Sequence, residues 1–250
     1  MAIFKYMGVI GEEKFFDKLT VRITEPHKYN DPFELRVNFK SKNILSYGRS
    51  KIESVVLHSI KNSLKRYVID SDEIEFYQHD IDQNILEEIC EKVGTTCFTI
   101  SKETKPVNVL MWAHYADCHR GIAIEFNENS DVIKYSSPVT YASRRPIYDA
   151  KALDDLDSVS LSELYVKSSE WKYENEIRLA QRLEDCELEN GIYVTNIPID
   201  SISKVFIGVN ADYKLKELAL NFHKKTNIPI IFTKISETDF SFEVTQVYEK

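Results

Sequence analysis

Apolar residues recur at helical spacing in four stretches of the chain. These stretches predict helices over residues 50–64, 81–93, 160–165 and 215–225. The first and third begin with the Ser-x-x-Glu pattern of a capping box. The second ends at Gly94, a residue typical of helix C-termini, and the fourth ends in two lysines, whose charge suits that position.

Shorter apolar runs typical of strands occupy much of the chain after residue 94. They predict strands over residues 96–101, 121–126, 132–142, 175–183, 191–199, 204–209 and 228–235. Several runs follow one another without a helix between them, which favours a mixed, mostly antiparallel sheet with helices packed on it. The sequence therefore predicts an α+β fold, organised as a single domain of residues 1–250 with a helix-rich insertion at about 50–94.

The composition is that of a globular protein with a substantial core. The chain has 250 residues, of which 43% are hydrophobic and 29% charged. No apolar run approaches the roughly 20 residues of a membrane helix, and the first residues lack the basic and apolar regions of a secretion signal. The four cysteines form no Cys-x-x-Cys pair, so neither a zinc knuckle nor a dithiol redox motif is indicated. We expect a cytoplasmic protein that does not enter a membrane.

Charge and glycine content limit the expected partners. A net charge of -8, spread over the chain, does not predict a basic groove for duplex nucleic acid, and a local basic patch stays open as the alternative. Neither the G-x-G-x-x-G pattern nor the P-loop pattern occurs. A bound nucleotide is therefore expected to be held in some manner other than that of Rossmann or P-loop proteins.

The segment from 108 to 119 carries an unusual number of chemically capable side chains. If it is a short helix, His114, Tyr115 and Cys118 share one face. His119 then lies at the helix end, where an imidazole can serve as acid, base or hydrogen-bond donor. The alternative is that the aromatic residues belong to the core and the histidines bond to the backbone.

The segment from 167 to 179 combines aromatic residues with two carboxylates. In an extended conformation Glu174, Glu176 and Arg178 lie on one face, with Ile177 on the opposite, core-facing side. Two nearby carboxylates repel unless a cation, a ligand or a shared proton relieves them, and the arginine is a candidate for that cation. The alternative is a solvent-facing strand with an ordinary carboxylate-arginine pair.

The segment from 24 to 36 contains a turn at Asn30-Asp31-Pro32. Phe33 is expected to anchor this turn to the core, while Asp31 and Glu34 point elsewhere. A purely structural turn is the favoured interpretation, and a contribution of its polar residues to a site is the alternative.

These segments together resemble the bacterial family called domain of unknown function 2971. The resemblance rests on five motifs in order: Phe4-Lys5-Tyr6, Asn30 to Glu34, Cys97-Phe98-Thr99, Met111 to Ala116 followed by His119 to Gly121, and Trp171 to Arg178. Thr99 departs from the family's serine but keeps a hydroxyl. The family resemblance implies no reaction.

A weaker similarity to ADP-ribosyltransferases lies in an early strand with an aromatic residue and a late strand with Glu-x-Glu. It implies that Glu176 stabilises the charge that develops as nicotinamide leaves NAD, that Tyr115 or Trp171 stacks on the nicotinamide, and that Tyr6 and His114 hold the ribose or pyrophosphate. The candidate catalytic residues are then Glu176, Glu174, His114, Tyr115 and His119, and the candidate ligand-binding residues are Tyr6, Asn30, Asp31, Glu34, Trp112, Trp171 and Arg178.

The similarity thus implies an NAD-utilising or NAD-cleaving enzyme, of the kind found among bacterial phage-defence and toxin effectors, with a macromolecular acceptor or protein partner. Two other classes stay open. A metal-dependent hydrolase or nuclease would use Asp31, Glu34, Glu174 and Glu176 as Mg²⁺ ligands and His114 or His119 as general base. A non-catalytic module would bind a nucleotide or peptide without turnover. No metal site is predicted for the NAD-cleaving interpretation, and NAD is expected as its substrate.

Overall fold

The computed structural model describes residues 1–34, 38–40, 92–145, 147–149 and 165–248. The chain divides into two compact units, each built from separated segments. Unit 1 comprises Met1–Thr24, Thr95–Pro138 and Tyr173–Lys250, and unit 2 comprises Glu25–Gly94 and Val139–Lys172. No helix in the described part of the chain is long and apolar enough to cross a membrane.

Unit 1 is built on an eight-stranded sheet within the described residues, in the order β15-β14-β13-β5-β1-β4-β10-β6. Within this sheet, the strand pairs β1–β4, β1–β5, β5–β13, β6–β10 and β14–β15 are antiparallel, and β13–β14 is parallel. This confirms the predicted mixed, mostly antiparallel α+β fold. A smaller sheet has the order β11-β12-β2. The strands of both sheets are β1 (Ala2–Met7), β2 (Thr20–Ile23), β4 (Val93–Ser101), β5 (Ile122–Phe126), β6 (Ser137–Pro138), β10 (Glu176–Arg182), β11 (Glu187–Glu189), β12 (Ile192–Asn196), β13 (Ile202–Ile207), β14 (Ile230–Ile235) and β15 (Phe242–Tyr248).

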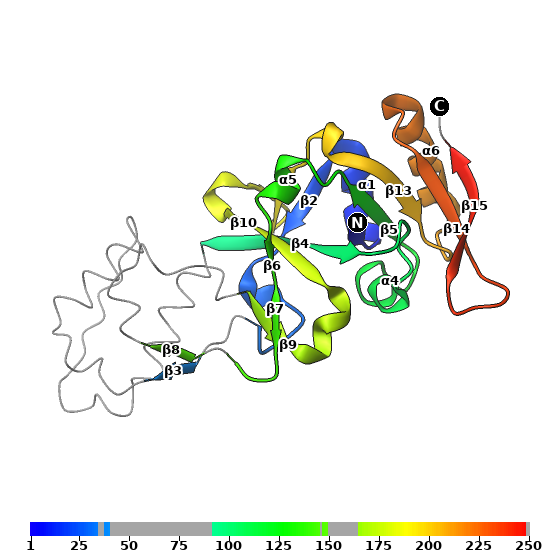
Figure 1. Ribbon diagram of the computed structural model, residues 1–250. Coiled ribbons are helices and arrows are strands. Elements are labelled where there is room, and N and C mark those ends of the chain that lie inside the picture. Colours follow the sequence, from blue (N-terminus) through cyan, green and yellow to red (C-terminus); the bar gives the residue numbers. More distant parts are fainter. Residues whose placement is uncertain (35–37, 41–91, 146, 150–164, 249–250) are drawn as a thin grey trace. The chain divides into compact units, whose positions relative to one another are not determined.

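Helices cover both faces of the larger sheet. The first face carries α1 (Val9–Lys18) and α6 (Tyr213–Thr226), whose Phe15 and Phe222 rings lie 5.7 Å apart between centroids. The second face carries α4 (Val109–Tyr115), whose Trp112 packs with Phe4 and Phe206 in a separate apolar cluster. Figure 1 shows α6 beside β14, and the β14–β15 hairpin at one end of the sheet. Alternating side chains along each strand supply the two clusters.

The remaining elements are short. In unit 2, β3 (Asn38–Lys40) pairs with β8 (Ile147–Asp149), and β7 (Thr140–Ala142) pairs with β9 (Val166–Ser168); both pairs are parallel. The other short helices are η1 (Pro26–Lys28), α5 (Asp131–Lys134), η5 (Ser169–Glu174), η6 (Leu183–Asp185) and η7 (Ile199–Ser201).

Most predicted strands after residue 94 are confirmed, with the exception of the run 132–142. That run begins inside α5, continues through a turn into β6, and ends in β7. The neighbours Val132 and Ile133 are both buried. One turn of helix allows this, whereas adjacent residues of a strand point to opposite faces of a sheet. The helix predicted over 215–225 is confirmed as α6.

The predicted helix end at Gly94 is wrong, because Gly94 lies within β4 and the β-branched Thr95 and Thr96 that follow it favour a strand. The helix predicted over 50–64, residues 160–164 of the helix predicted over 160–165, and residues 81–91 of the helix predicted over 81–93 lie outside the described residues. The helix-rich insertion at about 50–94 and the single domain therefore stay predictions.

Candidate functional site

Helix α4 positions the candidate residues His114 and Tyr115. Its N-cap residue Asn108 accepts hydrogen bonds from the backbone N–H groups of Leu110 and Met111, at 3.0 and 3.4 Å. The amide of Asn108 also donates to the carbonyl oxygen of Tyr173 at 2.9 Å, which ties the helix start to the segment before β10. The helix is shorter than predicted, so Cys118 lies beyond it and does not share its face.

Trp112 and Tyr6 lie in the core beneath this site. The Trp112 side chain is 1% exposed, and its indole N–H donates to the carbonyl oxygen of Pro106 at 2.6 Å. The Tyr6 ring meets the Trp112 ring edge to face, with centroids 5.4 Å apart. Burial raises the pKa of Tyr6 above its ordinary value. Both residues therefore support the site from below.

Two side-chain pairs join α4 to the segment before β10. The hydroxyl of Tyr115 donates to the buried carboxylate of Glu174. Nδ1 of His114 lies 3.0 Å from the hydroxyl of Tyr173. The pairs place two aromatic residues, an imidazole and a carboxylate side by side, and Tyr173 enters the site although it was not among the predicted site residues.

Glu176 and Arg178 form a buried ion pair at the start of β10. The guanidinium donates from Nε to Glu176 Oε1 at 2.6 Å and from Nη2 to Oε2 at 2.9 Å. Glu176 is 6% and Arg178 1% exposed. Ile177 between them faces the first core cluster, as the predicted alternation requires. A two-point pair of this kind fixes the orientation of the carboxylate.

Asn175 separates the two carboxylates and changes the expected geometry. Its backbone is left-handed, with φ of 44°, so Glu174 ends the 3-10 helix η5 and β10 begins at Glu176. Its side chain donates to the carbonyl oxygen of Ile100 at 2.6 Å. The expectation that Glu174 continues the strand face of Glu176 is therefore wrong, because the chain turns between them.

Cys97 and Lys5 lie next to Glu176 and were not predicted as site residues. Burial, together with the charge of Glu176, raises the pKa of the Cys97 thiol well above its usual range. The ammonium of Lys5 donates to the Cys97 carbonyl oxygen at 3.2 Å. Burial lowers the pKa of Lys5, and Cys97 and Glu176 partly oppose this. A single lysine inside the apolar run AIFKYM was the sequence signal for this position.

The turn after α4 holds an unusual backbone. Asp117, Cys118 and His119 are consecutive left-handed residues, with φ of 47°, 52° and 67°. L-residues rarely adopt this region, and each such residue costs about 1–2 kcal/mol. Asn210 donates from its backbone N–H to the His119 carbonyl oxygen at 3.0 Å, and from its side chain to that of Cys118 at 3.3 Å. The surroundings therefore hold the turn in its strained form.

This turn fixes the imidazole of His119. The ring packs against Phe242 with centroids 5.5 Å apart, and Phe242 also contacts Trp112. Partial burial lowers the pKa of His119, so the neutral ring is favoured at neutral pH. Its Nδ1 is buried and has no hydrogen-bond partner within the described part of the chain.

The other candidate residues lie in unit 2. Asn30 is exposed. Asp31 and Glu34 are buried, at 5% and 7% exposure, while Phe33 is 62% exposed. Oδ1 of Asp31 accepts the backbone N–H of Phe33 at 2.9 Å, and this side-chain turn directs the phenyl ring outward. The predicted anchoring role of Phe33 is therefore wrong.

Glu34 and Trp171 share a buried lysine that the sequence analysis missed. The Lys167 ammonium lies 3.7 Å from Glu34 Oε2 and 4.8 Å from the centroid of the Trp171 ring. Lys167 is only 5% exposed. The carboxylate and the aromatic face both favour its charged form. The sequence did not predict this burial, because β9 has three residues and is too short to show a pattern of alternation.

No metal site is formed within the part of the chain that the structure describes, because no three His, Cys, Asp or Glu side chains there are arranged to hold a metal ion. Unit 1 instead contains two buried carboxylates, of which Tyr115 holds Glu174 and Arg178 holds Glu176. Of its two candidate histidines, His114 lies against Tyr173 and His119 against Phe242. The fold and this site define an α+β protein with a desolvated acidic centre.

Residues 111–179 match the family described as Protein of unknown function (DUF2971). The matched range contains both the histidine-rich segment and the two carboxylates of the site, and it confirms the resemblance predicted from these motifs. No curated protein and no solved structure matches the chain. The family match therefore covers the site residues of α4 and β10, but it names no reaction for them.

Proposed function

We propose that the protein cleaves the bond between nicotinamide and ribose in NAD, either to release free ADP-ribose or to transfer it to an acceptor. One observation carries this proposal. Glu174 and Glu176 are both almost fully buried, and Tyr115 and Arg178 hold them in fixed positions. Fixed charges in a site from which water is excluded stabilise a transition state more strongly than the same charges in water.

The reaction needs negative charge where the ribose becomes cationic. As nicotinamide leaves with the bonding electron pair, positive charge develops at the ribose carbon. The carboxylates of Glu174 and Glu176 are the groups that supply this negative charge, and the neighbouring cations Arg178 and Lys5 offset part of it. Arg178 orients Glu176, while Tyr115 orients Glu174, so neither carboxylate has to reorganise during the reaction.

The acceptor then loses a proton to a base. In hydrolysis, a water oxygen forms the new bond to the ribose carbon, and the released proton goes to an imidazole. His119 suits this role because its lowered pKa keeps the ring neutral at neutral pH. His114, held by Tyr173, contacts the substrate as a hydrogen-bonding group. Trp112 and Tyr6 support these residues from the core.

The test is nicotinamide release from NAD by purified protein. We expect release by the wild type, without loss when EDTA is added, and no release by Glu176→Gln. Removing one member of a buried ion pair destabilises a fold by about 3–5 kcal/mol. The double variant Glu176→Gln with Arg178→Gln removes both charges and is therefore the matched variant for folding. Circular dichroism verifies that each protein is folded.

Glu125→Gln is the control for the loss of a carboxylate elsewhere on the sheet. Glu125 is partly buried, lies 3.3 Å from the Lys204 ammonium, and belongs to β5 rather than to the site. It should keep nicotinamide release. Equal release by a folded Glu176→Gln variant would refute the assigned role, and release that EDTA abolishes would favour a metal-dependent hydrolase. Binding of NAD without product in every variant would favour a binding module.

The biological setting that we propose follows from the family resemblance. NAD cleavage by a bacterial defence or toxin effector acts inside the cytoplasm, on a substrate that every cell contains. A macromolecular acceptor is expected if nicotinamide release requires cell extract. The same assay, run with and without extract, separates hydrolysis from transfer.

A further inference from the structure

Strand β15 forms one end of the large sheet, and its outer side pairs with no other described strand. On its inner side it pairs with β14. The strand has seven residues, FEVTQVY, most of them aromatic or β-branched residues that favour strands. An edge strand of this kind offers backbone N–H and C=O groups to another strand.

Apart from a β-bulge, β15 lacks the usual protections of an edge strand. It contains no lysine, arginine or proline. Its one charged residue, Glu243, is already engaged within the hairpin, where Lys234 lies 3.1 Å away and the Ser236 hydroxyl donates at 2.8 Å. A second strand that approaches β15 therefore meets no uncompensated charge.

A β-bulge sets the directions of the side chains. The pairing with β14 shifts by one residue at Thr245, so Val244 lies opposite Thr233 and Val247 opposite Ile231. Thr233 and Ile231 are two positions apart on β14, hence they face the same side of the sheet. Val244 and Val247 consequently share that face, although they are three residues apart, and they are 41% and 44% exposed.

This spacing makes the strand complementary to itself. When two copies of β15 run antiparallel about a two-fold axis, one register places Val244 of each copy opposite Val247 of the other. The same register places Glu243 opposite Tyr248, which lies on the other face with it. Valine meets valine on one face, and no like charges meet on the other.

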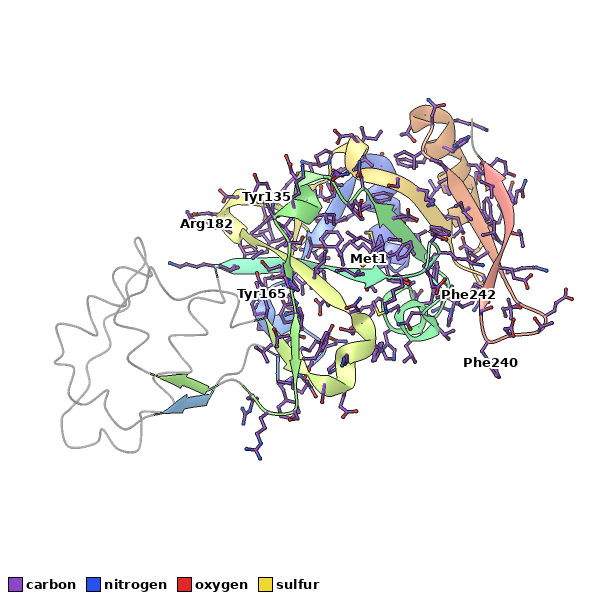
Figure 2. The ribbon with its side chains drawn as sticks, in the orientation of Figure 1. Met1, Tyr135, Tyr165, Arg182, Phe240 and Phe242 are labelled. Atoms are coloured by element: carbon purple, nitrogen blue, oxygen red, sulfur yellow. The ribbon has the colours of Figure 1, made fainter. Side chains whose placement is uncertain are left out.

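We propose that the protein forms a two-fold symmetric dimer by antiparallel pairing of β15 with β15 of a second copy. The two large sheets then join into one continuous sheet. Phe240 lies outside the paired residues, at the tip of the hairpin, where Figure 2 shows its side chain projecting from the loop. It is fully exposed and provides a matched comparison for general hydrophobic association.

The test is the molar mass in solution, measured by sedimentation over a wide range of protein concentration. We expect the wild type to have twice the 29.1 kDa of one chain, and Val244→Lys and Val247→Lys to have the mass of one chain. Phe240→Lys should remain dimeric. Circular dichroism verifies that the variants are folded. Folding is expected, because the substituted side chains are exposed on an edge strand.

A wild type that is monomeric at every concentration would overturn the proposal, and would leave the edge to a strand of a different protein. Dissociation by Phe240→Lys, or a dimer that both folded valine variants retain, would place the contact elsewhere on the chain and overturn it too. None of these outcomes depends on NAD cleavage, so the dimer and the proposed activity are tested separately.

Discussion

Single hydroxyl and carboxylate groups decide how the acidic centre of unit 1 is held. Tyr115 reaches Glu174 from a different element, so its hydroxyl is the group that fixes this carboxylate with respect to α4. Tyr115→Phe keeps the ring and removes the hydroxyl. Because Glu174 is only 2% exposed, we expect a loss of about 1–3 kcal/mol in the free energy of unfolding. Urea denaturation measures the difference.

The matched control is Tyr248→Phe, whose hydroxyl bonds to the exposed Gln246 near the chain end. We expect that control to unfold like the wild type. A Tyr115→Phe variant as stable as the control would show that the bond to Glu174 contributes nothing measurable. Nicotinamide release by Tyr115→Phe should also decrease if Glu174 takes part in the reaction.

The pKa of His119 makes a prediction about pH. Burial lowers this pKa below 6.5, so in acid the unfolded chain binds a proton more readily than the folded one. The stabilisation by the neutral ring is present above the unfolded value and is lost as the pH falls through 6.5 toward the lowered folded value. We expect His119→Gln to flatten the dependence of unfolding free energy on pH below about pH 6.5.

The exposed His27 supplies the comparison for this measurement. His27→Gln makes the same substitution at an exposed position outside the site, and so measures the effect of the replacement itself. If His119→Gln and the wild type show the same slope, the ring of His119 is solvated and its assignment as a neutral base fails.

The ion pair of Glu176 with Arg178 could be predicted from the sequence, because residues two apart in a strand share a face. The apolar run around Lys5 was a signal that this lysine is buried, but its partners could not be predicted, and neither could the burial of Lys167. Their burial depends on Cys97 in one case and on Glu34 and Trp171 in the other, partners that are distant in sequence. Local periodicity contains no information on such contacts.

The turn after α4 depends on close approach between two glycines and neighbouring carbonyl groups. A Cβ on Gly208 would lie 2.2 Å from the His119 carbonyl oxygen, and one on Gly121 would lie 2.0 Å from that of Met7. We expect Gly208→Ala to lower the free energy of unfolding by about 1–3 kcal/mol, or more if the turn cannot shift. Thermal and urea unfolding measure this loss.

Gly191→Asn is the control for glycine loss in a turn. Gly191 has a φ of 79° and nothing near the position of a Cβ, and asparagine tolerates that conformation. Its stability should stay close to that of the wild type. Equal stability of Gly208→Ala would mean that the strained turn adjusts freely and does not fix His119.

At the level of elements, strands with strong alternation were predictable and short turns were not. The positions of β5, β10, β13 and β14 follow from apolar runs in the sequence. Three left-handed residues in succession do not, because Asp117, Cys118 and His119 have no glycine among them. Tertiary hydrogen bonds from Asn210 impose that conformation against local preference.

On the scale of the whole molecule, unit 1 is assembled from three separated segments. The ends of its first two segments are joined by backbone hydrogen bonds. The N–H of Thr24 donates to the carbonyl oxygen of Thr95 at 2.8 Å, and the N–H of Thr95 donates to that of Thr24 at 2.9 Å. We therefore expect unit 1 to fold when an Asn-Gly turn replaces residues 25–94 and a Gly/Ser linker replaces residues 139–172.

Tryptophan fluorescence measures this directly, because the chain has two tryptophans and the shortened chain keeps only Trp112. A folded unit 1 should give the blue-shifted emission of a side chain that is 1% exposed. Emission that matches the urea-unfolded protein would show that unit 1 requires the replaced segments for its stability.

Phe242 begins β15 and also contacts the rings of Trp112 and His119. The edge of the sheet and the candidate site therefore share one side chain, and a displacement of that ring changes the free energy at both places. Thermodynamic reciprocity then applies: if occupation of the site changes the affinity at β15 by some factor, occupation of β15 changes the affinity of the site by the same factor.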